Sequence, residues 1–376
     1  MAIPPRESWS ESLPISKPRL LIVTHVDWDH AWQRPQALAT ALTRDFDVCV
    51  VSPVARRRAQ LSVNPRNGLR VTRLLRLPGS LGSGALYRLN NAIAAWQVAR
   101  IARKRAPAAI VVTAPECAAW LPSSSDVPVV YDCMDDALAF AQHASVRALK
   151  ALGERHLLAR VSAVICTSET LMGRCVERGA ALHHVHLVPN GYDPAAFPVD
   201  ATVKLPVTGA LRFGYFGTIA DWLDFSLLIQ LLEANANLEV ELTGPVDAGS
   251  HPAHPRLHLH PPERNRDLRR AVAGCHAMIL PFRDTPLTRA VDPVKMYEYI
   301  ALGKPILCAM LPALAKFAPF ATFYDDTAGC LDLVARRAIT QPPGSEARAA
   351  FLADATWDQR AASIAKQLHL LLDPSR

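Results

Sequence analysis

No run of 18 or more apolar residues occurs in this chain of 376 residues, although half of its residues are hydrophobic. The sequence therefore predicts no membrane-spanning helix, and its length favours two domains that each bury a core. Residues 1–18 lack the basic-then-apolar order of a secretion signal and are rich in proline and serine. We interpret them as a flexible tail in front of the first strand.

Paired cysteines are also absent, because none of the eight cysteines belongs to a Cys-x-x-Cys motif. Several of them, such as Cys49 and Cys166, lie in apolar strand-like runs. This pattern is typical of buried free thiols in a reducing cytoplasm, and it argues against a disulfide framework. The histidine-rich segments 183–186 and 251–260 lack cysteine or carboxylate partners at ligand spacing. We therefore predict no metal site.

Acidic residues are missing between Val48 and Pro115, within a chain of net charge +7. A block of one sign attracts an anionic surface. An anionic membrane is the partner that we predict, because each nearby Lys or Arg contributes roughly 1 kcal/mol to binding it. No nucleic-acid motif accompanies the charge, so we predict no nucleic-acid partner. The alternative is a solvated basic face. The basic residues of this stretch are Arg56, Arg57, Arg58, Arg66, Arg70, Arg73, Arg76, Arg88, Arg100, Arg103, Lys104 and Arg105.

A dinucleotide-binding fingerprint is missing as well. The glycines Gly79, Gly82 and Gly84 have the wrong spacing, and no acid follows about 20 residues later. An NAD-dependent oxidoreductase is therefore disfavoured, and we predict no cofactor.

The chain does contain a regular alternation of β-rich and helix-like segments, which predicts parallel α/β sheets. Residues 19–200 form the first predicted domain, and the alternation restarts in a second domain at 201–355, after a Pro- and Gly-rich break at 186–208. A last amphipathic helix in 356–376 is predicted to pack back on the first domain. Such a pair of doubly wound domains forms a ligand cleft between the carboxyl ends of its two sheets. The predicted strands are 19–24, 46–51, 69–77, 109–113, 128–131, 163–167, 211–216, 238–243, 257–260, 277–282, 305–309 and 322–324.

The segment 292–305 reads as a helix that begins at this cleft. Asp292 suits an N-cap and Pro293 the first helical position. The free N–H groups that follow, together with the helix dipole and Lys295, form a site for a diphosphate. Glu298 lies on the same side of the helix as Lys295 and can accept hydrogen bonds from the hydroxyls of a ribose. The alternative is an ordinary capped helix with a Lys–Glu surface pair.

Several motifs resemble those of GT-B glycosyltransferases of bacterial exopolysaccharide and cell-envelope polysaccharide assembly. Residues 293–305 are similar to the signature P-x-K-x-Y-E-Y-x-A-x-G-K-P of these proteins. The other matching segments follow in the same order along the chain, over roughly residues 19–310. They are W-Q-R-P-Q-x-L-A at 32–39, Y-D-x-x-D-D at 131–136, T-S-E at 167–169, V-P-N-G-Y-D at 188–193 and G-Y-F-G-x-I-x-x-W at 214–222.

The resemblance implies a GT-B fold of two Rossmann-like domains, with a nucleotide-sugar donor bound to the second and no metal required. Glu298 matches the glutamate that holds the donor ribose in the larger retaining clan, whereas the sugar-binding glutamate of that clan is replaced by Ala290. The Arg/Lys pair of the clan is also missing near the glycine loop at 217, so Lys295 carries more of the diphosphate charge. The predicted donor-binding residues are Gly217, Thr218, Asp292, Val294, Lys295, Met296 and Glu298.

Three acids follow the strand 128–131 at its carboxyl end, where they face the cleft. They are Asp132, Asp135 and Asp136, and neighbouring acids are expected to raise one another's pKa, as a general base requires. We predict Asp136 as the base and Asp135 as second choice, because Asp136 matches the base of related glucuronosyltransferases. The alternative is that these acids cap the loop, or bind the acceptor in a retaining enzyme. The predicted acceptor-binding residues are His25, Asp27, Trp28 and Arg34, although Trp28 can equally serve packing.

The sequence thus predicts a metal-independent hexosyltransferase that moves a sugar from a nucleoside-diphosphate sugar to a lipid-linked glycan. UDP is the commonest donor nucleotide of the family. We expect the protein in the cytoplasm, peripheral on the inner face of the membrane. Two alternatives stay open: a nucleotide-sugar isomerase or epimerase on the same fold, and a non-catalytic scaffold of an envelope-polysaccharide complex. The nucleotide base, the sugar, the linkage and the stereochemical outcome are not determined by these motifs.

Overall fold

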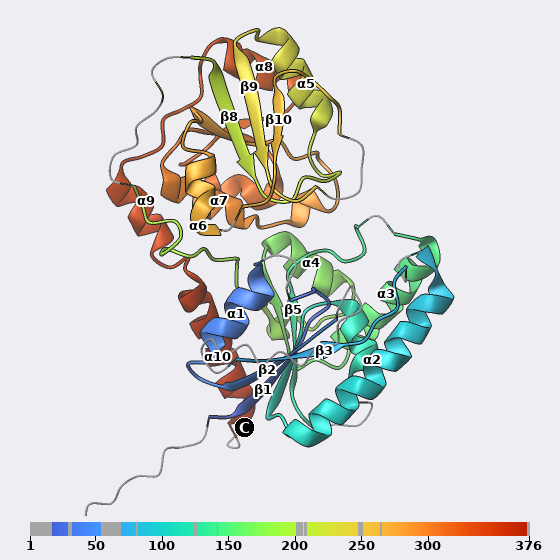
Figure 1. Ribbon diagram of the computed structural model, residues 1–376. Helices are drawn as coiled ribbons and strands as arrows, with labels where there is room; N and C mark the ends of the chain where they lie inside the picture. Colours follow the sequence, from blue (N-terminus) through green and yellow to red (C-terminus); the bar gives the residue numbers. More distant parts are fainter. Residues whose placement is uncertain are drawn as a thin grey trace, which may run out of the picture.

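The computed structural model describes residues 17–28, 32–53, 69–79, 82–122, 126–140, 142–200, 206, 209–246, 251–263 and 265–373. Residues 1–16 of the predicted tail lie outside this set, and so do four arginines of the basic block, Arg56, Arg57, Arg58 and Arg66. Two α/β domains lie one above the other, with the first domain at the bottom of Figure 1 and the second at the top.

The first domain is built on a seven-stranded parallel sheet of order β3-β2-β1-β4-β5-β6-β7. Its strands are fully buried at sequences such as AIVV in β4 and AVIC in β6, because helices cover both faces of a parallel sheet. The order reverses between β1 and β4, so the carboxyl ends of these two strands mark the switch point where ligands bind in such sheets. The strands are β1 (Arg19–Val23), β2 (Asp47–Pro53), β3 (Arg70–Leu74), β4 (Ala109–Val112), β5 (Val129–Cys133), β6 (Ala163–Cys166) and β7 (Val185–Leu187).

Helices cover the two faces of this sheet. The helices α2 (Gly84–Arg105), α3 (Ala144–Leu158) and α4 (Glu169–Glu177), with the 3-10 helix η3 (Pro115–Trp120), bury their apolar residues against one face. The helix α1 (Arg34–Leu42) covers the other. A short 3-10 helix, η4 (Leu182–His184), precedes β7.

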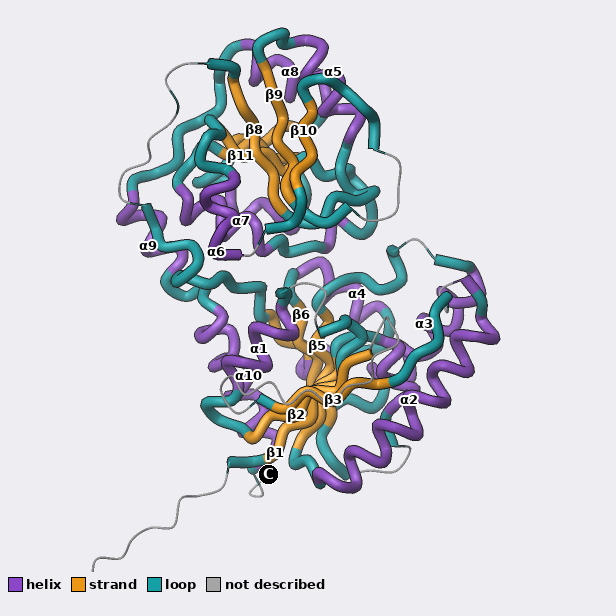
Figure 2. Tube along the Cα trace, in the orientation of Figure 1, coloured by secondary structure: helices purple, strands orange, loops and turns teal. Residues whose placement is uncertain are grey.

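The second domain has a six-stranded parallel sheet of order β10-β9-β8-β11-β12-β13 around one hydrophobic cluster. Figure 2 shows β8, β9 and β10 side by side at the front of this domain. The strands are β8 (Leu211–Phe216), β9 (Leu238–Thr243), β10 (Leu257–His260), β11 (Ala277–Leu280), β12 (Ile306–Ala309) and β13 (Thr322–Tyr324). The helices are α5 (Phe225–Ala234), α6 (Asn265–Ala271), α7 (Val294–Leu302), α8 (Thr327–Ala335) and α9 (Ser345–Leu352), with 3-10 helices η5 (Thr288–Ala290) and η6 (Pro312–Phe317).

The last helix, α10 (Trp357–Leu372), returns to the first domain. It runs beside α1 in Figure 1, and its Trp357, Ile364 and Leu368 belong to the same buried cluster as β1 and α1. The chain therefore crosses between the domains twice. Among the described residues, no helix has both the length and the apolar character that a membrane crossing requires.

The predicted fold class of two parallel α/β sheets is confirmed, but three local predictions are wrong. The break predicted from residue 186 overlaps β7, an edge strand of three residues that is too short to show a pattern. The strand predicted at 69–77 ends at Leu74, because the side chains of Gln97 and Asn90 bind the backbone of Leu75 and Leu77. The helix N-cap predicted at Asp292 is the third error.

Candidate active site

The donor helix α7 begins at Val294, and its N-cap residue is Pro293 in extended conformation, with no side chain capping it. The first amides of a helix have no α-helical partner, but here the Met296 N–H donates to the Pro293 carbonyl at 3.1 Å. The amides of Val294 and Lys295 are the ones that this end can offer to an anion. Asp292 does not cap the helix, because its buried carboxylate turns toward the domain junction. There it accepts a hydrogen bond from the backbone N–H of Asn190 at 2.6 Å and pairs with Lys316 Nζ at 2.8 Å. Asp292 therefore has no free carboxylate with which it could bind the donor.

Lys295 lies against the loop that follows β8. Its Nζ lies 5.4 Å from the centroid of the Tyr215 ring and 5.9 Å from that of Phe282. Gly217 has φ of +130°, and a Cβ on it would lie 2.0 Å from Lys295 Cε and 2.7 Å from Nζ. A side chain at this position would strain the backbone and displace Lys295. The structure thus brings together two of the predicted donor-binding segments.

A second glycine, Gly244, supports the same loop and was missed by the sequence analysis. Its φ is +153°, and a Cβ on it would lie 2.1 Å from the carbonyl oxygen of Gly217. The signal was its place directly after β9, where a sharp turn needs a residue without a side chain. Thr218 accepts a hydrogen bond from the Tyr215 hydroxyl through its backbone carbonyl at 2.8 Å. The loop after β8 is therefore supported by Gly244 on one side and by the Tyr215 hydroxyl on the other.

Glu298 lies one turn into α7, next to Lys295. Its side chain is 7% exposed, and no hydrogen bond or ion pair joins its carboxylate to the described residues. Burial raises the pKa of Glu298 to about 7, although the positive charge of Lys295 acts in the opposite direction. A buried acid of this kind can accept hydrogen bonds from a ligand without first breaking a protein contact. Met296, also predicted at the donor site, is a fully buried core residue, and its backbone N–H donates to the Pro293 carbonyl at 3.1 Å.

Arg34 has a structural role, in contrast to the predicted contact with the acceptor. Its guanidinium is buried and donates from Nε and NH2 to Asp132 at 2.8–3.0 Å, and from NH1 to the Pro189 carbonyl and to Asn190 Oδ1. An acceptor cannot displace these bonds without leaving Asp132 as an unpaired buried charge. Arg34 therefore links α1 to β5 and to the interdomain linker through its hydrogen bonds.

Asp135 and Asp136 differ sharply in their surroundings. Asp136 is buried between Arg174 at 2.7 Å and Arg178 at 2.9 Å. Burial alone would raise its pKa, but hydrogen bonding and charge from Arg178, together with Arg174, lower it. The expectation that neighbouring acids raise the pKa of Asp136 is therefore wrong, and its oxygens are engaged. Burial instead raises the pKa of Asp135 to about 7, against the opposing charge of Arg34.

The remaining predicted acceptor residues follow β1. His25 Nδ1 lies 3.2 Å from Thr113 Oγ1 at the switch point, and burial lowers the pKa of His25. Asp27 forms an ion pair with Arg73 at 3.4 Å. Trp28 is a core residue whose ring packs in the cluster beneath α1, so it cannot stack on a sugar. The structure thus places His25 and Asp27 after the carboxyl end of β1, and it shows that Trp28 belongs to the core and not to the site.

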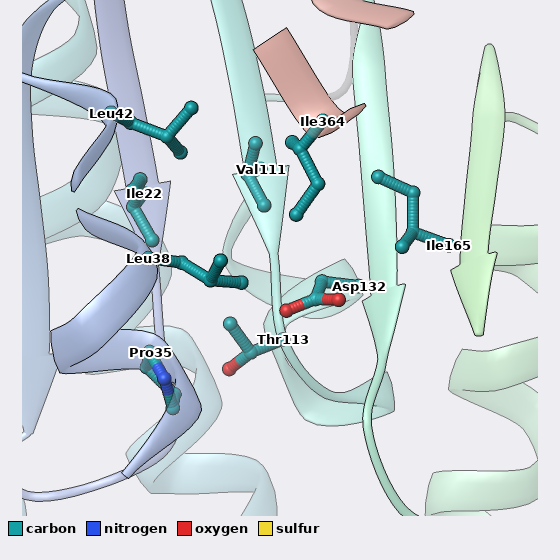
Figure 3. A pocket seen from close by; sticks show the side chains of 9 residues that line it. All are labelled: Ile22, Pro35, Leu38, Leu42, Val111, Thr113, Asp132, Ile165 and Ile364. Carbon is teal, nitrogen blue, oxygen red and sulfur yellow. The ribbon is translucent and has the colours of Figure 1, made fainter. Parts of the chain in front are cut away.

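A cavity lies beneath α1 and α10, and Figure 3 shows that Thr113 and Asp132 supply its polar atoms. Its other walls are aliphatic, so it is a packing defect of the core beneath the Arg34–Asp132 pair and does not contain the donor residues. It is lined by Ile22, Pro35, Leu38, Leu42, Val111, Thr113, Asp132, Ile165 and Ile364.

Residues 31–191 match the family described as the Glycosyl transferase 4-like domain. Over 227 residues the chain is 23% identical to a Bacillus subtilis protein, TuaH, whose name describes a teichuronic acid biosynthesis glycosyltransferase. This match covers 55% of the chain and 57% of the relative, so the chain spans little more than half the length of the relative that it matches.

Solved structures match nearly the whole chain. A sucrose-phosphate synthase from Thermosynechococcus elongatus superposes with a TM-score of 0.76 at 14% identity, covering 94% of this chain and 99% of that one. The trehalose 6-phosphate synthase of Burkholderia multivorans has a TM-score of 0.67 at 12% identity, with coverage of 96% and 100%. Anabaena HepE, in complex with UDP and glucose, has 0.63 at 15% identity, with coverage of 94% and 97%. The chain therefore has the GT-B fold, and its first domain carries the match to the glycosyl transferase 4-like family.

Proposed function

We propose that the protein is a glycosyltransferase that moves a hexose from a UDP-sugar to a glycan acceptor in polysaccharide biosynthesis. One observation carries this proposal: Lys295, at the start of α7, lies over Gly217, and beside it is the carboxylate of Glu298, which has no hydrogen-bond or ion-pair partner among the described residues. Lys295 and the Gly217 loop suit a diphosphate, and the Glu298 carboxylate suits the hydroxyls of a ribose. Structures of the same fold are described as complexes with UDP-glucose and with UDP-2-fluoro glucose, which supports a UDP-linked donor.

The departing UDP gains negative charge as the bond between the sugar C1 and the phosphate oxygen breaks. The N-terminus of α7 and the ammonium of Lys295 stabilise that charge electrostatically. We propose that this arrangement makes a divalent cation unnecessary. The rate of UDP release is then expected to be equal in EDTA and in Mg²⁺, and a fall of tenfold or more in EDTA would contradict metal independence.

The acceptor hydroxyl must lose a proton as its oxygen bonds to C1. We assign this proton to Asp135 in place of the predicted Asp136, because Asp135 is half-buried, forms no ion pair with an arginine among the described residues, and has the raised pKa of a general base. An anomeric product that retains the configuration of the donor would leave Asp135 as an acceptor-binding residue. NMR of the first product formed distinguishes the two outcomes.

The acceptor that we propose is a lipid-linked glycan at an anionic membrane surface, reached from the cytoplasm. The exposed side of α2 and the strand end before it combine apolar and basic side chains. Trp96 is 63% exposed and Leu75 is 57% exposed. Arg88, Arg100, Arg103 and Lys104 of the same helix are also exposed. An interfacial helix presents such a mixture, with aromatic rings among the acyl chains and cations at the phosphates.

Titration calorimetry tests the donor site directly. We expect UDP to bind the purified protein in the micromolar range, with GDP and dTDP weaker by tenfold or more, and Glu298→Ala to abolish binding. Equal affinity for another diphosphate would correct the nucleotide. Absence of binding to all three would overturn the transferase and favour a scaffold that kept the fold.

Vesicle flotation tests the membrane proposal separately. The protein is expected to float with vesicles of phosphatidylglycerol and phosphatidylcholine but not with phosphatidylcholine alone. The double variant Trp96→Ala/Arg100→Glu should lose most of this binding. Arg270→Glu/Arg336→Glu, which reverses two exposed charges of the second domain, is the matched control. Equal recovery with both vesicle types would remove the membrane surface from the proposal.

A further inference from the structure

The two crossings between the domains are packed against each other at residues 190–192 and 355–357. The Tyr192 N–H donates to the Ala355 carbonyl at 2.9 Å, and the Trp357 N–H donates to the Tyr192 carbonyl at 3.2 Å. A Cβ on Gly191 would lie 2.9 Å from the backbone of Thr356. The junction is therefore a close-packed double crossing, and a residue within it can hold the domains at a defined separation.

Asn190 lies in this junction and is bonded to residues of both domains. Its side chain is 8% exposed, and all four of its polar groups are bonded. The backbone N–H donates to Asp292 Oδ2 at 2.6 Å, and the side-chain Nδ2 donates to the Asp292 carbonyl at 2.5 Å. Its Oδ1 accepts from Arg34 NH1 at 3.2 Å, and its carbonyl accepts from Arg360 Nε at 3.1 Å. The Asn190 side chain thus joins α1 to the segment before α7, and its backbone carbonyl adds a bond to α10.

On the donor side, these bonds fix the start of α7. Asp292 precedes the first residue of the helix by two positions and is itself held by Lys316 and by the Tyr297 hydroxyl at 3.1 Å. The main chain that leads from Asp292 to Lys295 therefore begins at a point set by Asn190. The bond from Nδ2 to the Asp292 carbonyl leaves little freedom of rotation there.

On the acceptor side, Asn190 helps to place Arg34. The guanidinium divides its donors between Asp132, at the end of β5, and the linker residues Pro189 and Asn190. Asp135 lies three residues after Asp132, and the charge of Arg34 is the largest influence that opposes the rise of its pKa. A shift of the linker therefore changes the charge that Asp135 experiences.

We propose that Asn190 is a positioning residue for sugar transfer: through its bonds to Asp292 and Arg34, it fixes the start of the donor helix relative to Asp135. The inference rests on the proposed function for its catalytic consequence, whereas the structural coupling stands without it. A displacement of about 1 Å between reacting groups can cost roughly 100-fold in rate. A side chain that binds residues of both domains is placed to prevent such a displacement.

The test compares Asn190→Ala with Asn90→Ala. Asn90 is equally buried and also makes two side-chain bonds, to the N–H and carbonyl of Leu77, but it lies on α2 away from the junction. In Asn190→Ala we expect kcat for UDP release from UDP-glucose to fall about 100-fold, while the Kd of UDP stays within threefold. The acid limb of the kcat profile should move to higher pH, because Arg34 loses an anchor beside Asp135. Asn90→Ala should change none of these three quantities.

A second measurement is independent of catalysis. Hydrogen exchange followed by mass spectrometry should show faster exchange of the amides at 292–296 in Asn190→Ala than in the wild type, with no change there in Asn90→Ala. Unchanged exchange in Asn190→Ala, or equal kinetic loss in both variants, would overturn the positioning role. An inactive wild type with accelerated exchange in Asn190→Ala would instead refute the transferase proposal and retain the coupling.

Discussion

Asp135 and Asp136 are adjacent in the chain, but their environments separate their chemistry. Arg174 of α4 and Arg178, which directly follows that helix, hold Asp136 in its charged form. Asp135 is half-buried, forms no such ion pair among the described residues, and has a pKa raised to about 7. The distinction depends on Arg174 and Arg178, which lie about 40 residues further along the chain. The sequence around Asp135 and Asp136 therefore does not indicate which of the two acids is paired with arginine.

The substitution Asp135→Asn tests the assignment of the base. We expect kcat/KM to fall by a factor of about 10² to 10⁴, the usual contribution of a general base. In the wild type, activity should decline as the pH falls below about 7, because protonation of Asp135 removes the base. A pH series of initial rates measures both effects. Retention of the acid limb in Asp135→Asn would assign it to another group.

The substitution Asp136→Asn should affect stability before chemistry. Loss of this carboxylate leaves Arg174 without its carboxylate partner and Arg178 paired with Glu154 alone, and we expect the free energy of unfolding to fall by roughly 2 kcal/mol. The folded pKa of Asp136 is lowered, so its contribution is present above the unfolded pKa of about 4 and is lost as the pH falls through the folded value. Urea denaturation should therefore show a smaller difference in free energy of unfolding between the wild type and Asp136→Asn at pH 3 than at pH 7. An equal difference at both pH values would contradict the charge pairing.

At the scale of elements, the proposed donor site is a contact between a loop and a helix. The loop after β8 approaches α7 so closely that Lys295 occupies the space where a side chain on residue 217 would lie. The sequence indicated both segments, because a glycine after a strand and a proline before a helix are strong local signals. Their contact requires the order β9-β8-β11, which places the end of β8 beside the strand that leads to α7.

The substitution Gly217→Ala is expected to weaken UDP binding by tenfold or more, because the new methyl group displaces Lys295. Gly179→Ala is the matched control, since Gly179 has a similar φ of +111° but no atom within 4 Å of a Cβ. Backbone strain is then common to both variants, and only Gly217→Ala moves the lysine. Calorimetric titration with UDP compares them, and similar affinities in the two variants would refute the contact.

For the whole molecule, the end of the chain completes the first domain. Residues of α10 fill the face of the first sheet that α1 leaves incomplete, although more than 300 residues separate the two helices in sequence. The stability of the first domain therefore depends on the chain crossing back after the second.

Truncation of Leu368 to alanine tests this dependence. Leu368 is fully buried in the cluster beneath α1, so we expect a loss of about 3 kcal/mol in the free energy of unfolding. Leu182→Ala, at a leucine that is 69% exposed, should cost little. Chemical denaturation monitored by tryptophan fluorescence measures both, and equal stability of Leu368→Ala and the wild type would contradict the packing of α10.

The sequence by itself determined the fold class, because the alternation of apolar strands with amphipathic helices and the placing of Gly and Pro are local properties. It also indicated Lys295, Glu298 and Gly217, which lie where strands and helices begin or end. Only the tertiary structure decided the roles of Arg34, Asp136 and Asp292. Each of these is a buried charge whose role depends on its partner, and those partners lie about 25 to 100 residues away. Such pairs form only when the chain has folded, so no local motif distinguishes a charge that binds a ligand from one that holds the domains together.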